Sequence, residues 1–193
     1  MAKVANHVFS TNSSVIKDLL TQYKNTFYAF CELINNSIQA NSTVIDIKVD
    51  YAKSELTKAP IKGITIRDNG NCVSLSDFDK KILEIGTDVK KGGQGVGRFA
   101  ALQIGSNIEI ETVGHDDKLK KYTKVILPIN STLFENRKLV DMKFPADEAI
   151  LKGKHNTYYQ VLIKALHHNQ NAKTDRKNSI AKELLEENVR LSL

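Results

Sequence analysis

A carboxylate and two amides lie about one turn apart on a predicted helix. The run from Thr26 to Asn41 contains neither proline nor glycine and is long enough for about four turns. At roughly 100° per residue, Glu32, Asn36 and Gln39 fall nearly opposite the apolar face of this helix. That apolar face comprises Phe27, Phe30, Cys31, Ile34 and Ile38. The opposite face is either a solvated polar surface or a set of groups for chemistry, and the rest of the chain bears on the choice.

A glycine-rich stretch is the second feature with chemical potential. It reads Gly92-Gly93-Gln94-Gly95-Val96-Gly97-Arg98-Phe99, and a predicted helix starts at its end. Exposed backbone amides next to a helix N-terminus make a natural phosphate site. Two familiar motifs do not fit, because Arg98 and Phe99 replace the lysine and hydroxyl of a P-loop, and Arg98 replaces the last glycine of a dinucleotide fingerprint. The alternative is a flexible loop with a helix cap.

Asp68 and Gly70 form the third feature, directly after a predicted strand. A carboxylate at a strand end can accept a hydrogen bond from a purine amino group, while a glycine lets the base lie against the backbone. Adenine presents this donor, and guanine does not present it at the same position. Alone, the pair is also typical of a simple turn. Thr157, which opens a late strand, is either a further polar group for this site or an ordinary strand start.

In combination and in this order, these features resemble the GHKL superfamily. This superfamily includes gyrase B subunits, the large heat-shock chaperones, MutL, MORC proteins and histidine kinases. The resemblance covers about residues 27–163. The residues 32–37 resemble the N-box, 66–72 the first glycine box and 92–99 the second. It implies the Bergerat ATP-binding fold, with ATP and Mg²⁺ as cofactors.

The resemblance also implies roles for individual residues. Asn36 would bind Mg²⁺ through its side-chain oxygen, and Glu32 would act in catalysis by polarising the water that attacks the γ-phosphate. Asp68 would read the adenine amino group, with support from Thr157 through a water. Glycines 92–97 would close as a lid, with Lys90, Lys91 or Arg98 neutralising phosphate charge. The implied nucleotide-binding set is Asn36, Ala40, Asp68, Gly70, Lys91, Gly92, Gly93, Gly95, Val96, Gly97, Arg98 and Thr157.

Two positions depart from the family pattern. Cys72 stands where the first glycine box usually has a second glycine, which implies a tighter or differently shaped base pocket. Gln39 stands where many members have aspartate, which weakens the implied support near the nucleotide.

Glu32 favours ATP hydrolysis over phosphotransfer, because histidine kinases generally have asparagine at that position. None of the five histidines lies in a recognisable phosphoacceptor helix upstream. We therefore expect slow, Mg²⁺-dependent hydrolysis that drives lid closure and dimerisation, through the N-terminal segment and the lid, of a larger protein. The alternatives are a non-hydrolysing, nucleotide-switched interaction module and histidine kinase-like phosphotransfer. Nucleic-acid binding is a third hypothesis that rests on positive charge alone.

The hydrophobic pattern predicts the elements that must position these residues. Either a first strand or a flexible arm is predicted around 7–9, and strands are predicted at 43–51, 61–67, 108–113, 122–129, 138–144 and 158–163. Helices are predicted from Ser13 or Ser14 to Tyr23, at 26–41, 75–83 and 97–104, and in the polar tail 169–193, with a loop at 84–95. This order predicts an α/β (α+β) two-layer sandwich, with a mixed, mostly antiparallel sheet covered on one face by helices.

Length and composition set the outer bounds. The 193 residues, 41% hydrophobic and 26% charged with a formal charge of +6, are typical of a globular protein. We expect an ATP-binding domain at 1–165, followed by a polar linker and helical tail at 166–193. The chain is either a small stand-alone member or, as we favour, a piece of a longer protein whose tail leads to a further domain. No apolar run approaches a membrane span and no signal-peptide pattern is present, so a cytoplasmic or nuclear location is expected. Cys31 and Cys72 lack metal-site spacing.

Overall fold

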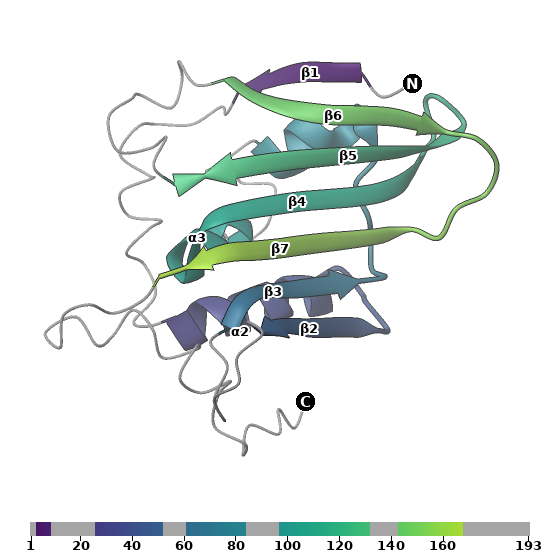
Figure 1. Ribbon diagram of the computed structural model, residues 1–193. Coiled ribbons are helices and arrows are strands. Elements are labelled where there is room, and N and C mark those ends of the chain that lie inside the picture. The colour runs from purple at the N-terminus through teal and green to yellow at the C-terminus, as the bar shows by residue number, and fades with distance from the viewer. Residues whose placement is uncertain (1–2, 9–25, 52–60, 84–96, 132–142, 168–193) are drawn as a thin grey trace, which may run out of the picture.

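The computed structural model describes residues 3–8, 26–51, 61–83, 97–131 and 143–167 (Figure 1). Seven strands form one sheet in the order β1-β6-β5-β4-β7-β3-β2. Their bounds are β1 Lys3–Val8, β2 Ile45–Tyr51, β3 Ile61–Asp68, β4 Gly105–Asp116, β5 Lys121–Asn130, β6 Lys143–Leu151 and β7 Tyr158–Leu166. The expected two-layer sandwich is confirmed. Among the described residues every strand pair is antiparallel, so the sheet there is less mixed than expected.

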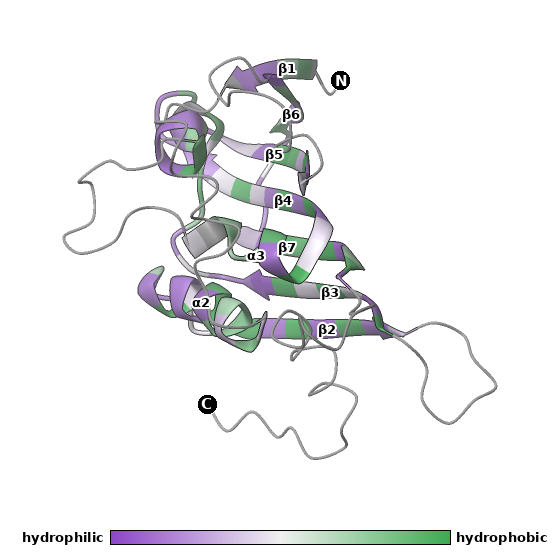
Figure 2. Cartoon of the chain, turned by 90° about the vertical axis from the view of Figure 1, so that its left-hand side faces the viewer, coloured by the Kyte–Doolittle hydropathy of each residue, from purple (hydrophilic) through white to green (hydrophobic). Residues whose placement is uncertain are grey.

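The helices cover one face of the sheet (Figures 1 and 2). They are α2 Thr26–Gln39, the short 3-10 helix η1 Leu75–Asp77, the π-helical turn η2 Asp79–Leu83, the 3-10 turn η3 Gly97–Phe99 and α3 Ala101–Ile104. The predicted helix at 97–104 is therefore present as two short pieces, and Phe99, Leu102 and Ile104 are buried as expected. Buried and exposed side chains alternate along the strands beneath the helices, as in β3, where Ile64 and Ile66 are buried.

Helix α2 presents a different face to the core from the one predicted. Its buried residues are Thr26, Ala29, Phe30, Leu33, Ile34 and Ser37. Ile38, assigned to the core from the sequence, is 55% exposed, and Phe27 and Cys31 are only partly buried. The prediction was wrong because it placed the buried face from apolar residues alone and gave Ser37 no part in it. Its hydroxyl has a buried hydrogen-bond partner, Asp68, which removes most of the cost of burying it.

The C-terminus of α2 is closed by a Schellman motif. Asn41 has a left-handed backbone, with φ of 59°, and its amide donates to the Ile38 carbonyl at 2.9 Å. The Ser42 amide donates to the Ser37 carbonyl at 3.2 Å. Asparagine is one of the few residues besides glycine that tolerates this conformation. The motif reverses the chain so that Ser42 returns beside the end of β3.

The chain that follows Asp68 is held down by polar side chains of β4 and β5. Thr112 accepts from the Val73 amide at 3.1 Å, and Thr123 accepts from the Leu75 amide at 3.0 Å. Asp116 is fully buried and accepts from three amides, those of Ser76, Lys118 and Leu119, at 2.8–3.1 Å. Burial opposes ionisation of Asp116, but these hydrogen bonds outweigh it and hold its pKa below the ordinary value. Residues 73–77 are thereby fixed over the sheet.

Several strand boundaries differ from the sequence predictions: β1 is Lys3–Val8 and not 7–9, β7 continues to Leu166, and β6 and β4 differ most instructively. The strand predicted at 138–144 ends too early, since β6 continues to Leu151, while residues 138–142 lie outside the described part. Pro145 and the acidic Asp147 concealed the pattern, yet Phe144 and Ala146 are buried in strict alternation with them. β4 continues to Asp116, beyond the predicted turn at Gly114, because Asp116 caps the turn itself.

Several predictions concern residues outside the described part of the chain. These are the helix from Ser13 or Ser14 to Tyr23, the loop at 84–95 and the helical tail at 169–193. The domain division at residue 165 also stays a prediction, since the described chain ends at 167. No helix within the described residues has the length and apolarity required to cross a membrane.

Candidate functional site

Asp68 is a buried carboxylate at the end of β3, held by the end of α2. It is 4% exposed. Ser37 donates its hydroxyl to Asp68 Oδ2 at 2.8 Å, and the Gly70 amide donates to Oδ1 at 2.9 Å. The Ser42 hydroxyl lies 2.9 Å from Oδ1 and 2.6 Å from the Ser37 carbonyl, and its single proton serves one of these acceptors at a time. We call Ser37, Ser42, Asp68 and Gly70 the Asp68 cluster.

Gly70 is a glycine because the turn that follows α2 passes very close to it. A Cβ added at Gly70 would lie 2.5 Å from Ser42 Oγ, 2.6 Å from the Ala40 carbonyl oxygen and 2.9 Å from the Ala40 Cβ. The same Ala40 carbonyl accepts from the Asn71 amide at 2.7 Å. Ala40 and Gly70, both assigned to the site from the sequence, therefore contact each other. The glycine is required first by internal packing, a reason that the sequence did not supply.

Cys72 and Thr157 border this cluster. The Cys72 thiol donates to the Gly70 carbonyl, with Sγ 3.0 Å from the oxygen. Burial raises the pKa of the Cys72 thiol, the hydrogen bond with the Thr157 side chain lowers it, and the nearby Asp68 charge raises it further. The net rise keeps the thiol protonated near neutral pH. Thr157, from the connection before β7, is thus brought to the Asp68 cluster, with Cys72 as its hydrogen-bond partner.

A second cluster forms farther toward the N-terminus of α2. A Cβ added at Gly97 would lie 2.5 Å from Glu32 Oε1 and 3.0 Å from Asn36 Nδ2. Asn36 Nδ2 is buried and has no hydrogen-bond partner among the described residues. A buried amide nitrogen normally donates a hydrogen bond, so this one is a candidate donor to a bound group. We call Glu32, Asn36 and Gly97 the Gly97 cluster.

The remaining predicted site residues lie mostly outside the described part. Lys90, Lys91, Gly92, Gly93, Gly95 and Val96 are all outside it, as is the side chain of Arg98. Gln39, one of the two departures from the family pattern, is exposed on α2. The structure thus brings residues of the predicted N-box next to Gly97, which begins η3, and next to Asp68 at the end of β3.

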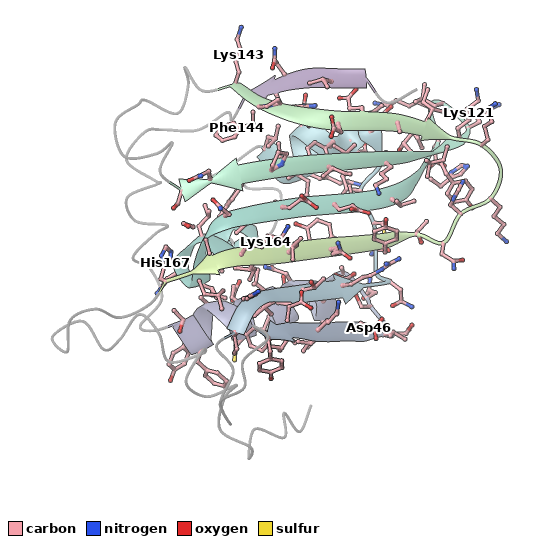
Figure 3. All side chains as sticks on the ribbon, in the orientation of Figure 1. Asp46, Lys121, Lys143, Phe144, Lys164 and His167 are labelled. Carbon is pink, nitrogen blue, oxygen red and sulfur yellow. The ribbon has the colours of Figure 1, made fainter. Side chains whose placement is uncertain are left out.

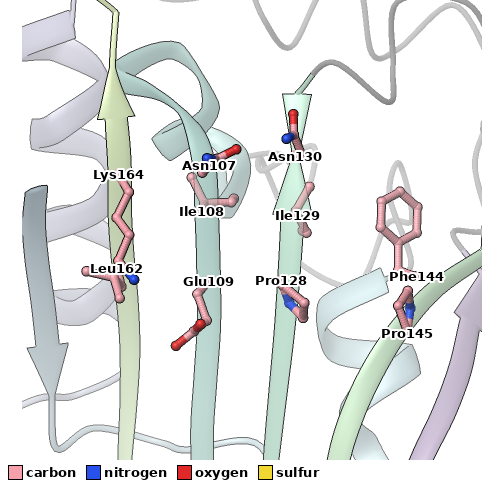
Figure 4. A pocket seen from close by; sticks show the side chains of 10 residues that line it. All are labelled: Asn107, Ile108, Glu109, Pro128, Ile129, Asn130, Phe144, Pro145, Leu162 and Lys164. Atoms are coloured by element: carbon pink, nitrogen blue, oxygen red, sulfur yellow. The ribbon is translucent and has the colours of Figure 1, made fainter.

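Two surface hollows can be compared with the site, one beside it and one away from it. One is lined by polar groups around the ends of β2, β3 and the start of β7: Val44, Asp46, Arg67, Asp68, Asn69, Asn156, Thr157 and Tyr158. It borders the Asp68 cluster. The other crosses β7, β4, β5 and β6, where Lys164, Glu109 and the Pro128 and Pro145 rings surround it (Figure 4). That hollow contains no residue of either cluster.

A family comparison accounts for this combination of fold and clusters. The model described as histidine kinase-, DNA gyrase B-, and HSP90-like ATPase matches residues 23–157. The chain belongs to this family. Members of this ATPase family generally bind ATP with Mg²⁺, so membership implies ATP binding. No curated protein gave a significant match to the chain.

Sequence reasoning missed two residues of the Asp68 cluster, Ser37 and Ser42. Ser37 follows Asn36 directly, and it was given no role of its own. A signal was present, since Ser37 continues the spacing of Phe30, Leu33 and Ile34 along the helix. Ser42 carried no such signal, because its position depends on the left-handed turn at Asn41.

Proposed function

We propose that this chain binds ATP with Mg²⁺ between the Asp68 cluster and the Gly97 cluster and hydrolyses it slowly. The observation that carries the proposal is the geometry of α2, whose adjacent residues Asn36 and Ser37 belong to the two clusters. One cluster offers a buried acceptor, and the other offers a carboxylate and a buried amide beside a glycine. A ligand with a polar ring at one end and an anionic chain at the other fits this arrangement.

The Asp68 cluster suits the amino group of adenine. An ionised carboxylate has about four lone-pair directions for hydrogen bonds. Ser37 and the Gly70 amide donate to Asp68, and Ser42 donates to it when its proton is not on the Ser37 carbonyl, so at least one direction is left for a further donor. An exocyclic amino group would supply that donor, while a carbonyl oxygen at the same place would repel the carboxylate. The cluster therefore favours adenine over guanine.

The residues of the Gly97 cluster fit a magnesium-bound triphosphate. The Asn36 side chain would offer its oxygen to Mg²⁺ and its buried, unsatisfied nitrogen to a phosphate oxygen. When bound, Mg²⁺ neutralises charge on the phosphate oxygens and so eases attack at the terminal phosphorus. Glu32, one turn earlier, would orient the attacking water and accept its proton. Gly97 packs directly against both side chains, so any larger residue there would displace the Glu32 carboxylate and the Asn36 amide.

Lid closure and dimerisation extend the proposal. Lys91, Gly92, Gly93, Gly95, Val96 and Arg98 would cover the phosphates, as the family resemblance implies. Closure would order the N-terminal segment and favour a dimer of a larger protein. Gel filtration with and without a non-hydrolysable ATP analogue measures this directly, and an unchanged elution volume at saturating analogue would remove this part of the proposal.

Calorimetric titration with a non-hydrolysable ATP analogue, with Mg²⁺ or with EDTA, tests the site. Asp68→Asn is expected to weaken binding about 10- to 100-fold, because a hydrogen bond to a charged group is worth about 1.5–3 kcal/mol. Asp116→Asn is the matched control, since it neutralises another buried carboxylate at the ends of the strands yet should leave the affinity unchanged. Equal losses in both variants, or no binding by the wild type, would contradict the proposal.

A further inference from the structure

A basic surface with interleaved rings lies where two strand connections meet. The β4–β5 turn contributes Lys118 and Lys120, β5 begins with Lys121, and the β6–β7 connection contributes Lys152 and Lys154. All five lysines are exposed, and none forms an ion pair within the described part of the chain. We call these five lysines, with His115, Tyr122 and His155, the basic turn surface.

The strand register brings the two connections side by side. Tyr122 pairs with Leu151 across β5 and β6, so the next residues outward, Lys121 and Lys152, are neighbours. Gly153, with a left-handed φ of 82° and nothing near its Cβ position, turns the β6–β7 connection at its tip. Nitrogen-tipped side chains gather around the labelled Lys121, at the end of the sheet opposite Lys143 and Lys164 (Figure 3).

The acidic residues of the same turns do not neutralise this charge. Asp116 is fully buried and occupied by three backbone amides. Asp117 is exposed and lies 2.9 Å from His115 Nδ1. Residues 114–121 and 151–157 thus contribute five lysines against two aspartates, and one of those aspartates faces inward. The excess of positive charge is concentrated here and not merely spread over the chain.

Three rings run between the lysines. The His115 and Tyr122 centroids are 5.2 Å apart and the Tyr122 and His155 centroids are 6.0 Å apart, both edge-to-face. His115 and His155 are exposed, and Tyr122 between them is half-buried. Unpaired cations would suit any polyanion, but exposed rings between them suit a polyanion that carries planar bases. Single strands offer both groups, whereas a duplex keeps its base faces stacked.

We propose that the basic turn surface binds single-stranded nucleic acid, with the lysines contacting phosphates and the rings contacting bases. This inference is independent of nucleotide hydrolysis, because no residue of the surface belongs to the Asp68 or Gly97 cluster. Thr157, which contacts Cys72, nevertheless lies three residues beyond Lys154 on the same connection. The bound nucleic acid would therefore lie at the same end of the sheet as Asp68.

Fluorescence anisotropy with labelled 20-nucleotide oligo-dT and oligo-U across a salt series tests the inference. A triple variant, Lys118→Glu, Lys121→Glu and Lys152→Glu, is expected to bind at least 10-fold more weakly at low salt. The slope of log affinity against log salt should fall by about 2, since each phosphate contact on a single strand contributes about 0.7. Both oligonucleotides should respond, because phosphates and ring faces are common to DNA and RNA.

A matched triple on other strands, Lys62→Glu, Lys143→Glu and Lys164→Glu, changes the net charge equally and should cost less than about 3-fold if the contacts are local. His155→Ala should weaken single strands about 5-fold or more and spare duplex DNA of the same length. Circular dichroism verifies that each variant is folded. Equal losses in the two triples, a preference for duplex, or binding only to acidic peptides or anionic vesicles would overturn the inference.

Discussion

The Asp68 cluster and the Gly97 cluster meet on neighbouring residues of α2, yet they differ in how fully their polar atoms are satisfied. Asp68 is bound by two serine hydroxyls and a backbone amide within the folded chain. Asn36 Nδ2, one residue before Ser37, has no partner among the described residues. One end of the proposed site is thus pre-organised by the protein alone. In the proposed function a bound nucleotide would complete the other end, where its binding energy could be used for chemistry.

The largest expected effect concerns the Gly97 cluster. Glu32→Ala should reduce ATP turnover about 10²- to 10⁴-fold, the range for removing a general base. Analogue affinity should change little, because Glu32 would contact the attacking water and not the bound nucleotide. Steady-state phosphate release and calorimetry measure the two quantities. If the wild type shows no turnover to lose while still binding ATP, the non-hydrolysing interaction module becomes the better description.

Alanine substitutions at Gly70 and Gly97 should affect the two clusters differently, because the two glycines pack against different atoms. Gly70→Ala should destabilise the fold by about 2–3 kcal/mol, because the added carbon meets the Ala40 backbone, which cannot yield easily. Gly97→Ala meets the free end of the Glu32 side chain, so it should cost less than about 1 kcal/mol yet displace that carboxylate and reduce turnover. Urea denaturation and turnover assays measure both. Equal loss of stability in the two variants would contradict the contrast.

Asp116 is a second buried carboxylate at a strand end, and it shows how much an ionised, hydrogen-bonded carboxylate stabilises this fold without belonging to either cluster. Its pKa in the folded protein is lowered, so its stabilising contribution is complete above the unfolded pKa of about 4 and is lost as the pH falls through the folded value. Asp116→Asn should cost about 2 kcal/mol at pH 7, and the difference from wild type should shrink toward pH 3. Denaturation curves at both pH values measure this. A constant difference would exclude the ionised carboxylate as its source.

The smallest effects compare adjacent residues. Ser37→Ala removes a hydrogen bond to a buried carboxylate and should cost about 1–1.5 kcal/mol. Asn36→Ala removes an unsatisfied buried amide and adds helix propensity, so the nucleotide-free protein should be unchanged or stabilised by up to about 0.5 kcal/mol. Thermal unfolding without nucleotide measures both. A cost for Asn36→Ala equal to that for Ser37→Ala would show that Asn36 is satisfied in the nucleotide-free state.

The sequence by itself determined the local features of this protein. Ile61–Asp68 forms a strand because its β-rich run ends at a turn signal, and α2 forms because no helix breaker interrupts it. The family and its two-layer fold were also indicated by the order of Glu32, Asn36, Asp68 and the glycines, because that motif consists of residue types at set spacings. Those signals are local, so no tertiary contact was needed to find them.

Tertiary structure decided how the local pieces are used. Asp68, which lies 31 residues after Ser37, decided which face of α2 is buried. Its hydrogen bond offsets the cost of burying the Ser37 hydroxyl. Ser42 reached the same carboxylate through the left-handed residue Asn41, and Gly70 is required because the turn after α2 packs against it. The lysines of two distant turns became one surface only through the β5–β6 register. Each of these facts joins residues far apart in the chain, and periodicity along the chain carries no information about such contacts.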